Sequence, residues 1–256
     1  MTDNIFSLKG KVALISGASS GLGEHIAEML ADKGVAVVCA ARRMDLLQNL
    51  ADRINAKGGK ALAVAMDVTE RNSVKAAFDA AEKEFGTPDI VVCNAGATGR
   101  QPFLEMEEAN WDHVLNVNIK GVFNVGQEGA QRLVAADKPG NIINISSICA
   151  VSSFKGLTHY SASKAAVNQL TRVMGHELAE HNICVNALAP GFLHTDLVAD
   201  YYETPQGKID LANLPLGRAG ELSELDGIIL LLASNAASYM SGSVVTADAA
   251  HSVRLG

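Results

Sequence analysis

The sequence predicts an α/β protein, a doubly wound parallel sheet with helices on both faces, folded as one domain over 1–256. Short apolar runs alternate with longer helical patterns almost to the end of the chain, a rhythm typical of β-α-β units. Most of these runs are continuous stretches of Val, Ile, Ala and Leu, as expected for strands covered on both faces. A length of 256 residues suits one such domain, and no internal repeat or linker divides it.

Seven apolar runs are the predicted strands, and six helical patterns lie between them. The strands are expected at 11–16, 36–41, 61–65, 90–93, 141–146, 183–188 and 243–247. The helices are expected at 22–33, 44–57, 72–85, 107–136, 158–180 and 224–233. Strands and helices in this order favour one parallel sheet over two separate domains.

The rhythm breaks at 191–217, where no clean periodicity is present and Tyr201, Tyr202, Pro205 and Pro215 occur. Segments of this length without regular structure are usually functional lids or disordered. This one follows the C-terminal end of a predicted strand, where open α/β sheets bind their ligands. We therefore predict a substrate lid at about 191–217, with an incidental surface insertion as the alternative.

Composition argues against several classes of protein. The formal net charge is −7 and no Lys- or Arg-rich run occurs, which argues against a nucleic-acid partner. The N-terminus lacks the regions of a secretory signal, and the longest apolar stretches, such as 228–233, are too short to span a bilayer. The four cysteines are scattered without a CxxC pair, so we expect no metal site, no disulfide and a cytoplasmic protein.

A glycine-rich turn follows the first predicted strand and opens the first predicted helix. Gly17 would allow a tight turn, Gly21 would let the backbone approach a pyrophosphate, and Gly23 would permit close packing of helix on strand. The helix N-terminus offers free N–H groups and a positive dipole end to phosphates. A purely structural turn is the alternative, but the position between strand and helix favours a dinucleotide site. The predicted residues of this turn are Gly17, Ser19, Ser20, Gly21, Leu22 and Gly23.

The second predicted strand ends in Ala41, Arg42 and Arg43. An acidic residue at this place would bind the ribose 2′-hydroxyl of NAD, whereas an arginine accommodates a 2′-phosphate. We therefore predict NADP(H) as the cofactor, with NAD(H) less favoured, and assign the phosphate mainly to Arg42. Arg43 is included in the site, although it could simply start a solvated helix.

Two further segments follow predicted strands and complete the predicted cofactor site. Asp67 and Val68 would flank the adenine, although Asp67 could instead cap a turn before Thr69. Small residues after the fourth strand would let a nucleotide sugar approach the backbone; they belong to the run Asn94, Ala95 and Gly96.

Tyr160 and Lys164 lie four residues apart on a predicted helix, and Ser147 ends an apolar run upstream. This spacing places the phenol and the ammonium group on one helix face. A neighbouring positive charge favours the phenolate, so we predict that Lys164 lowers the pKa of Tyr160 from about 10. The phenol would then be a proton donor or acceptor near neutral pH, with the hydroxyl of Ser147 holding the oxygen that exchanges the proton.

Together these motifs occur in the order and at the spacing of the short-chain dehydrogenase/reductase family, which the chain resembles over essentially its whole length. The resemblance implies a Rossmann-type, seven-stranded parallel sheet and a catalytic tetrad of Asn118, Ser147, Tyr160 and Lys164. It implies that Tyr160 exchanges the proton, that Lys164 also holds the nicotinamide ribose, and that Asn118 anchors a water that relays protons to Lys164.

The same resemblance implies further binding surfaces. The nicotinamide carboxamide site would be formed by Pro190, Gly191, Leu193 and Thr195. A homotetramer or homodimer would assemble through the long helices at 107–136 and 158–180.

The chain departs from the family pattern at three places. Ser16 replaces the usual threonine at the start of the glycine-rich turn, which keeps the hydroxyl. Ser20 replaces a basic residue, so the preference for NADP rests mainly on Arg42. After the last predicted strand the usual Asp-Gly-Gly reads Asp248-Ala249-Ala250, and the loss of both glycines bears on the local backbone and on the subunit contact beside it.

Membership of this family would define the chemistry better than the substrate. We expect hydride transfer between NADP(H) and a ketone, a 3-oxoacyl thioester or a sugar-like polyol. The arginines with which 3-oxoacyl-carrier-protein reductases grip their acidic carrier are matched here only by Lys138 and His181. A catalytically silent NADP-binding sensor or scaffold is the alternative from another class. The predicted pocket residues are Cys149, Ser153, Phe154, His159, Phe192, Leu197 and Tyr201. Of these, His159 could bind a polar substrate, but packing or solvent exposure is favoured for it.

Overall fold

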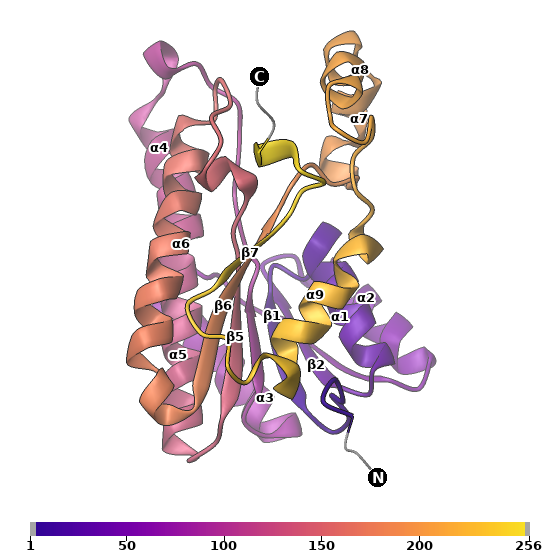
Figure 1. Cartoon of the computed structure of the whole chain (residues 1–256). Helices are drawn as coiled ribbons and strands as arrows, with labels where there is room; N and C mark the ends of the chain where they lie inside the picture. The colour runs from indigo at the N-terminus through magenta and orange to yellow at the C-terminus, as the bar shows by residue number, and fades with distance from the viewer. Residues whose placement is uncertain (1–3, 254–256) are drawn as a thin grey trace.

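Within residues 4–253, which the computed structural model describes apart from the side chains of 196–199, seven parallel strands form one central sheet. The strands are β1 (Val12–Ser16), β2 (Ala36–Ala41), β3 (Lys60–Ala65), β4 (Ile90–Cys93), β5 (Gly140–Ile145), β6 (Ile183–Pro190) and β7 (Val244–Ala247). They pair in the order β3-β2-β1-β4-β5-β6-β7 (Figure 1). The chain leaves β1 for β2 on one side and returns to β4 on the other. The C-terminal end of β1 is therefore the switch point at which such sheets bind ligands.

Helices cover both faces of this sheet (Figure 1). One face packs against α1 (Gly21–Asp32), α2 (Met44–Ala56) and α9 (Asp226–Ala233). The other packs against α3 (Arg71–Phe85), α5 (Gly121–Ala135) and α6 (Thr158–Glu177). Along β1, Ala13 and Ile15 belong to the first core, whereas Leu14 belongs to the second. Because each face needs apolar side chains, the strand is a continuous apolar run, and the predicted fold class is confirmed.

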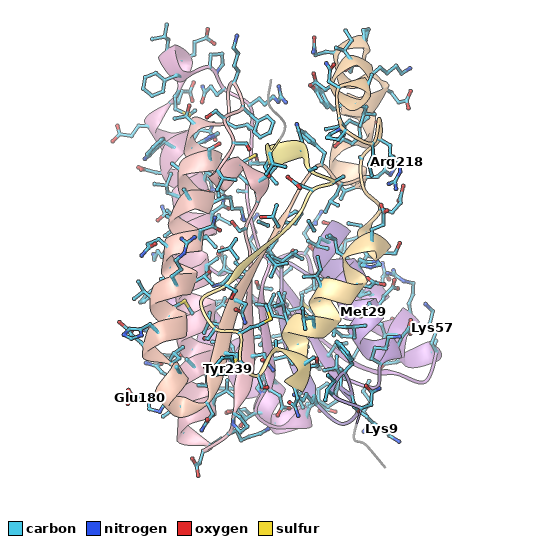
Figure 2. All side chains as sticks on the ribbon, viewed as in Figure 1. Lys9, Met29, Lys57, Glu180, Arg218 and Tyr239 are labelled. Carbon is cyan, nitrogen blue, oxygen red and sulfur yellow. The ribbon has the colours of Figure 1, made fainter. Side chains whose placement is uncertain are left out.

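Side chains fill the layers between the sheet and the helices, and charged groups such as Lys57 and Glu180 lie at the periphery (Figure 2). Phe78 of α3 is the largest fully buried side chain among the described residues. Burying a side chain of this size contributes about 1.5–3 kcal/mol to stability. Packing of this kind holds the strand ends, and the loops that follow them, in fixed positions.

The predicted helix at 107–136 is continuous but not uniform. It consists of α4 (Glu108–Leu115), a π-helical turn (Asn116–Lys120) and α5. At Gly121, which begins α5, a Cβ atom would lie 2.7 Å from the side chain of Val68, so α5 packs closely on the segment after β3. A π turn inserts one residue into the helical ladder, which re-aims nearby side chains and is frequent at functional sites. Asn118 lies within this turn.

The absence of regular structure inferred for 191–217 is wrong, because two short helices form there. They are α7 (Asp196–Glu203) and α8 (Pro205–Ala212), which stand beyond the C-terminal ends of the strands (Figure 1). Thr204 caps α8 by accepting a hydrogen bond from the Gly207 N–H at 3.0 Å, and Pro205 occupies its first position, where the missing N–H costs nothing. Arg218 lies near the base of this pair (Figure 2) and bonds both oxygens of Glu224, at 2.8 and 2.9 Å.

The turn after β7 has an unusual backbone. Ala249 and Ala250 both have positive φ angles, 51° and 66°, in a region where a Cβ atom costs about 1–2 kcal/mol per residue. The carboxylate of Asp248 offsets part of this cost. Its Oδ1 accepts from the Ala250 N–H at 3.0 Å and its Oδ2 accepts from the Ser252 N–H at 2.7 Å. The backbone therefore keeps the conformation that two glycines would adopt freely.

We expect Ala249→Gly and Ala250→Gly each to raise the free energy of unfolding by about 0.5–1 kcal/mol. The relief of left-handed strain, about 1–2 kcal/mol, exceeds the extra entropy that glycine gives the unfolded chain, about 0.4–1 kcal/mol. Urea unfolding followed by circular dichroism measures the change. Ala56→Gly, at an exposed site at the end of helix α2, is the control and should be destabilising. Equal destabilisation by all three substitutions would contradict the strain.

Candidate active site

A cavity of about 590 Å³ opens at the C-terminal ends of the strands, bordered by the segments that follow β1 to β6. Its size is in the range of small-molecule and cofactor sites. It brings together every residue of the predicted site except Gly23 and Asn118. These lining residues are Gly17, Ser19, Ser20, Gly21, Leu22, Arg42, Arg43, Asp67, Val68, Asn94, Ala95, Gly96, Ser147, Tyr160, Lys164, Pro190, Gly191, Leu193 and Thr195.

The glycine-rich turn is shaped by two positions that have no room for a side chain. Gly17 has a φ of +69°, and a Cβ there would lie 2.7 Å from the Ala95 Cα. At Gly23 a Cβ would collide with the amide group of Asn94 and the carbonyl of Gly17. Gly21, in contrast, has a φ of +58° with nothing within 4 Å of a Cβ. It therefore borders open space in which a ligand can approach the backbone.

Side-chain hydrogen bonds tie this turn to the end of β4. The Ser16 hydroxyl donates to the Val92 carbonyl at 3.1 Å and accepts from the N–H groups of Asn94 and Ala95, at 2.9 and 3.1 Å. The Asn94 amide donates in turn to the carbonyls of Ser16 and Gly17, at 3.0 and 3.1 Å. The Ser16 hydroxyl thus makes three hydrogen bonds, which join the turn after β1 to the segment after β4.

The N-terminus of α1 faces the same cavity. Its N-cap residue, Ser20, makes no side-chain bond to the helix backbone within the described structure. The first N–H groups of a helix have no partner inside the helix, and the helix dipole adds positive potential there. This end of α1 can therefore bind an anion such as a phosphate.

Arg43 is held over the turn. Its Nη2 donates to the hydroxyls of Ser19 and Ser20, at 2.9 and 2.7 Å, and its Nε lies 3.2 Å from the Ser19 hydroxyl. Two serines thus position the guanidinium of Arg43, which is exposed and precedes the first residue of α2, and its part in cofactor binding stays a prediction. Arg42 also borders the cavity and is exposed. Two arginines and two hydroxyls thus line the end of the cavity near β2.

Tyr160 and Lys164 face the opposite end of the cavity from α6. The Lys164 Nζ lies 5.5 Å from the centroid of the Tyr160 ring and donates to the Ile145 carbonyl at 2.8 Å. Ser147 lies at the start of the 3₁₀ turn Ile148–Ala150 and accepts from the Cys149 N–H at 3.1 Å. The predicted serine, tyrosine and lysine therefore meet at one place.

The prediction that Lys164 lowers the pKa of Tyr160 is wrong in this structure. Burial raises the pKa of Tyr160 to about 12, the nearby Cys149 adds to the rise, and the hydrogen bond to Ser147 counteracts it only in part. Burial also lowers the pKa of Lys164 to about 8. Desolvation penalises the charged form of both groups, so the attraction between phenolate and ammonium does not prevail. At neutral pH the phenol is a proton donor beside a lysine that is still mostly charged.

Asn118 does not line the cavity but supports it from behind. Its Oδ1 accepts from the Ala97 N–H at 2.7 Å, and its Nδ2 donates to the Ala97 carbonyl at 3.0 Å and to the Ser163 hydroxyl at 2.9 Å. Ser163 donates to the carbonyl of Tyr160 at 2.7 Å. The side chain of Asn118 therefore joins the loop after β4 to the helix that carries Tyr160 and Lys164. The anchoring of a water by Asn118 stays a prediction.

Some lining residues were not predicted from the sequence. His113 of α4 and Val117 of the π turn lie four residues apart, so their helical spacing could have indicated a shared face. The other unpredicted lining residues carry no distinctive signal; they are Ala41, Met66, Ala97, Thr98, Ile145 and Ser146.

The predicted pocket residues lie outside the lining of this cavity. His159 is fully buried, with its Nε2 3.4 Å from the Asn110 amide nitrogen, so it packs inside the protein, which is one of the two roles favoured for it over substrate binding. Phe154 and Phe192 pack edge to face, 5.6 Å between centroids, and both contact His251. The side chain of Leu197 lies outside the described part of the chain. The other three, Cys149, Ser153 and Tyr201, do not border the cavity either.

The described residues form neither a membrane-spanning helix nor a cluster of metal ligands. None of the helices within 4–253 has the length and apolarity needed to cross a membrane. In the same part of the chain, no group of three or more His, Cys, Asp or Glu side chains could hold a metal ion.

Comparison with known proteins gives one consistent answer. The family model described as short chain dehydrogenase matches residues 11–206. A 3-oxoacyl-[acyl-carrier-protein] reductase of Thermotoga maritima is 37% identical over 241 residues, covering 94% of this chain and 97% of the relative. A 2-dehydro-3-deoxy-D-gluconate 5-dehydrogenase of Escherichia coli is 37% identical over 244 residues, covering 95% of this chain and 96% of the relative. The crystal structure of a gluconate 5-dehydrogenase from Burkholderia cenocepacia in complex with NADP and tartrate superposes with a TM-score of 0.93, at 34% identity, covering 98% of both chains.

The titration of Lys164 should appear in the stability of the protein. Burial lowers its pKa from 10.5, the ordinary value for lysine, to about 8 in the folded state, so between these values the unfolded chain binds more protons than the folded one. The contribution of Lys164 to the free energy of unfolding therefore rises with pH from about 8. Above about pH 10 the raised pKa of Tyr160 opposes this rise, because the unfolded tyrosine then loses its proton before the folded one. We expect the stability of the wild type relative to Lys164→Met to increase between pH 8 and pH 10 in urea unfolding. A flat difference over that window would contradict the assignment.

Proposed function

The chain belongs to the short-chain dehydrogenase family, and from this premise we propose that it is an NADP(H)-dependent oxidoreductase. It would transfer hydride between the nicotinamide and the carbon of a ketone or secondary alcohol. One observation carries the proposal: the glycine-rich turn and the Ser147, Tyr160 and Lys164 group line one cavity at the switch point of the sheet. A binding site for a dinucleotide thus ends beside a proton donor.

The residues present fit the cofactor. Gly17 and Gly23 allow the close packing that shapes the turn, and Gly21, which borders open space, would hold the pyrophosphate together with the N-terminus of α1. Arg42 would bind the 2′-phosphate, and the guanidinium that Ser19 and Ser20 hold in place, that of Arg43, would be its second ligand. The bound NADP of the Burkholderia relative supports this choice over NAD.

The remaining cofactor residues are assigned by their place around the cavity. Asp67 and Val68 would flank the adenine, with Asn94, Ala95 and Gly96 beside the sugar. The carboxamide site would be formed by Pro190, Gly191, Leu193 and Thr195. When bound, the cofactor supplies or accepts the hydride; the chain itself binds, orients and moves protons.

The proton chemistry would be carried by Tyr160. With a pKa of about 12 the phenol is protonated at neutral pH, so it can donate to the oxygen of a carbonyl that is being reduced. Ser147 would donate a hydrogen bond to the same oxygen as negative charge develops on it. Lys164 would hold the nicotinamide ribose and stabilise the phenolate that remains. Asn118 would anchor the water that returns a proton to Lys164.

The substrate would be a ketone, a 3-oxoacyl thioester or a sugar-like polyol. The names of the relatives span the last two classes, an acyl-carrier-protein reductase and a sugar-acid dehydrogenase. The segment 191–217, with α7 and α8 beyond the strand ends, would be the substrate lid. We also propose a homodimer or homotetramer, since Phe123 and Val134 of α5 and Val173 of α6 are exposed. Cysteines that are all unpaired suit the reducing cytoplasm.

A screen of NADPH consumption with a panel of ketones, keto acids and acetoacetyl thioesters tests the proposed function. The wild type should oxidise NADPH with at least one carbonyl compound, and Tyr160→Phe should lower kcat at least 100-fold, because general acid catalysis contributes about 10²–10⁴-fold. Fluorescence titration should find NADPH binding changed less than about threefold. Binding of NADPH without any turnover by the wild type would favour the silent sensor, and an active Tyr160→Phe enzyme would refute the proton-donor role.

Arg42→Asp should shift the cofactor preference from NADP(H) towards NAD(H). A charge-assisted hydrogen bond contributes about 1.5–3 kcal/mol, so kcat/KM with NADPH should fall about 10- to 100-fold while that with NADH holds or rises. Arg172→Asp is the control, because Arg172 lies on the exposed surface of α6 and bonds Gln169 at 3.4 Å. If the ratio of kcat/KM with NADPH to kcat/KM with NADH does not change, Arg42 does not bind the 2′-phosphate.

A further inference from the structure

Arg100 lies where three segments meet beside the active site. It belongs to the loop after β4, and its guanidinium carbon lies 5.2 Å from the centroid of the Tyr201 ring on α7. A Cβ built on Gly156 would lie 3.7 Å from the Arg100 Cβ. The neighbouring Gln101 N–H donates to the Gly156 carbonyl at 2.9 Å. The side chain is therefore placed between the 151–157 loop and the helices of the proposed lid.

Tyr201 is held in place from its far side. Its hydroxyl donates to Asp210 Oδ2 on α8, and the Gln206 amide donates to Asp210 Oδ1 at 2.8 Å. Both oxygens of Asp210 are thus engaged by neighbours on its own segment. The ring of Tyr201 is fixed as a platform, and a cation over such a ring is stabilised without losing its hydrogen-bond donors.

The guanidinium of Arg100 still has its donors available. Among the described side chains, which leave out those of 196–199, it takes part in no hydrogen bond and no carboxylate lies within 4.0 Å of it. An arginine carries five N–H donors in a fixed fork, which matches a carboxylate in a two-point contact. The fork therefore has no hydrogen-bonded carboxylate among the described side chains, and the hydrogen bond from Tyr201 followed by the charge of Arg100 lowers the pKa of the nearby Asp210.

The charge of Arg100 also reaches the reacting end of the site. Burial raises the pKa of the Cys149 thiol, while the hydrogen bond to Ser147 and the charges of Lys164 and Arg100 lower it. Cys149 follows Ser147 by two residues and donates its backbone N–H to the Ser147 hydroxyl. Arg100 follows Thr98, which lines the cavity, by two residues, and its charge acts on the turn that carries Ser147. A short substrate whose carbonyl meets Ser147 and Tyr160 would extend towards Arg100.

We propose that Arg100 binds a carboxylate of the substrate, so that the substrate is a small hydroxy acid or keto acid. Tyr201 and Asp210 are positioning residues that hold the guanidinium. This inference rests on the proposed function and narrows it, since a neutral polyol would leave the fork without an anion. An acyl thioester would bring an apolar chain to the same end, where an unpaired cation would be desolvated at a cost.

The test compares an acid with its neutral analogue. The probes are 5-keto-D-gluconate and 5-keto-D-gluconamide, with acetoacetyl-CoA as the thioester. Arg100→Gln should lower kcat/KM for the acid about 10- to 100-fold, chiefly through KM, because a hydrogen bond to a charged group is lost. Turnover of the amide should change less than about threefold. Arg100→Lys should lie between, since it keeps the charge and loses the fork, and Arg172→Gln is the matched control.

Substitutions of Tyr201 test whether its ring positions the guanidinium of Arg100. Tyr201→Phe keeps the ring under the guanidinium but loses the bond to Asp210, so it should lower the preference for the acid over the amide only in part. Tyr201→Leu removes the ring and should reduce that preference towards the value of Arg100→Gln. Equal effects of the two substitutions would remove Tyr201 from the positioning role.

Failure of this inference can be told apart from failure of the proposed function. The carboxylate site is overturned if the wild type prefers the amide or acetoacetyl-CoA to the acid. It is also overturned if Arg100→Gln lowers kcat/KM for the acid and for the amide equally. In both cases the oxidoreductase activity itself is still observed. If no carbonyl is reduced at all, calorimetric titration of D-gluconate into the protein with NADP⁺ measures binding of a carboxylate directly. Binding that weakens at least tenfold in Arg100→Gln supports it, and absent or equal binding overturns it.

Discussion

The close approach of two chain segments at the switch point is the constraint on which the rest of this structure depends. A Cβ on Gly17 would lie 2.7 Å from the Ala95 Cα, and one on Gly23 would strike the Asn94 amide. Because β1 has β2 on one side and β4 on the other, its C-terminal loop lies over the start of the segment after β4. Only glycine allows the two to touch, and their contact sets the depth of the cavity.

Burial has opposite consequences for the two titrating groups at the other end of the cavity. It raises the pKa of Tyr160 and lowers that of Lys164, since in each case the charged form is desolvated. The pair is thereby kept in the state that suits proton donation, a neutral phenol beside an ammonium held by the Ile145 carbonyl. A phenolate would have to be stabilised at the moment of reaction, by the lysine and by Ser147, rather than in the resting site.

Sequence reasoning succeeded where a physical demand leaves a local pattern. Strands covered on both faces must be apolar throughout, so all seven were found, and glycines with no space for a Cβ mark the turn at β1. It failed where the outcome depends on three-dimensional burial. The sign of the pKa change at Tyr160 is of this kind. The helices α7 and α8 have eight residues each, and α8 begins at Pro205, so each is too short for a periodic signal. The hydrogen bonds of Arg43 could not be predicted, because its partners, Ser19 and Ser20, lie far from it in sequence.

The strained turn after β7 shows how the wall of the substrate region is held. A Cβ on Gly191 would lie 2.8 Å from the Asp248 Cα, so the end of β7 presses on the segment that leaves β6. Asp248 then bonds the two N–H groups that follow, and the left-handed conformation of Ala249 and Ala250 turns the chain back. That reversal puts His251 against Phe192, with 5.2 Å between ring centroids. Because a left-handed alanine persists only where its surroundings hold it, the aromatic contacts and the Asp248 carboxylate together maintain the turn. The turn lines a smaller cavity of about 180 Å³, which shares Leu193 with the active-site cavity.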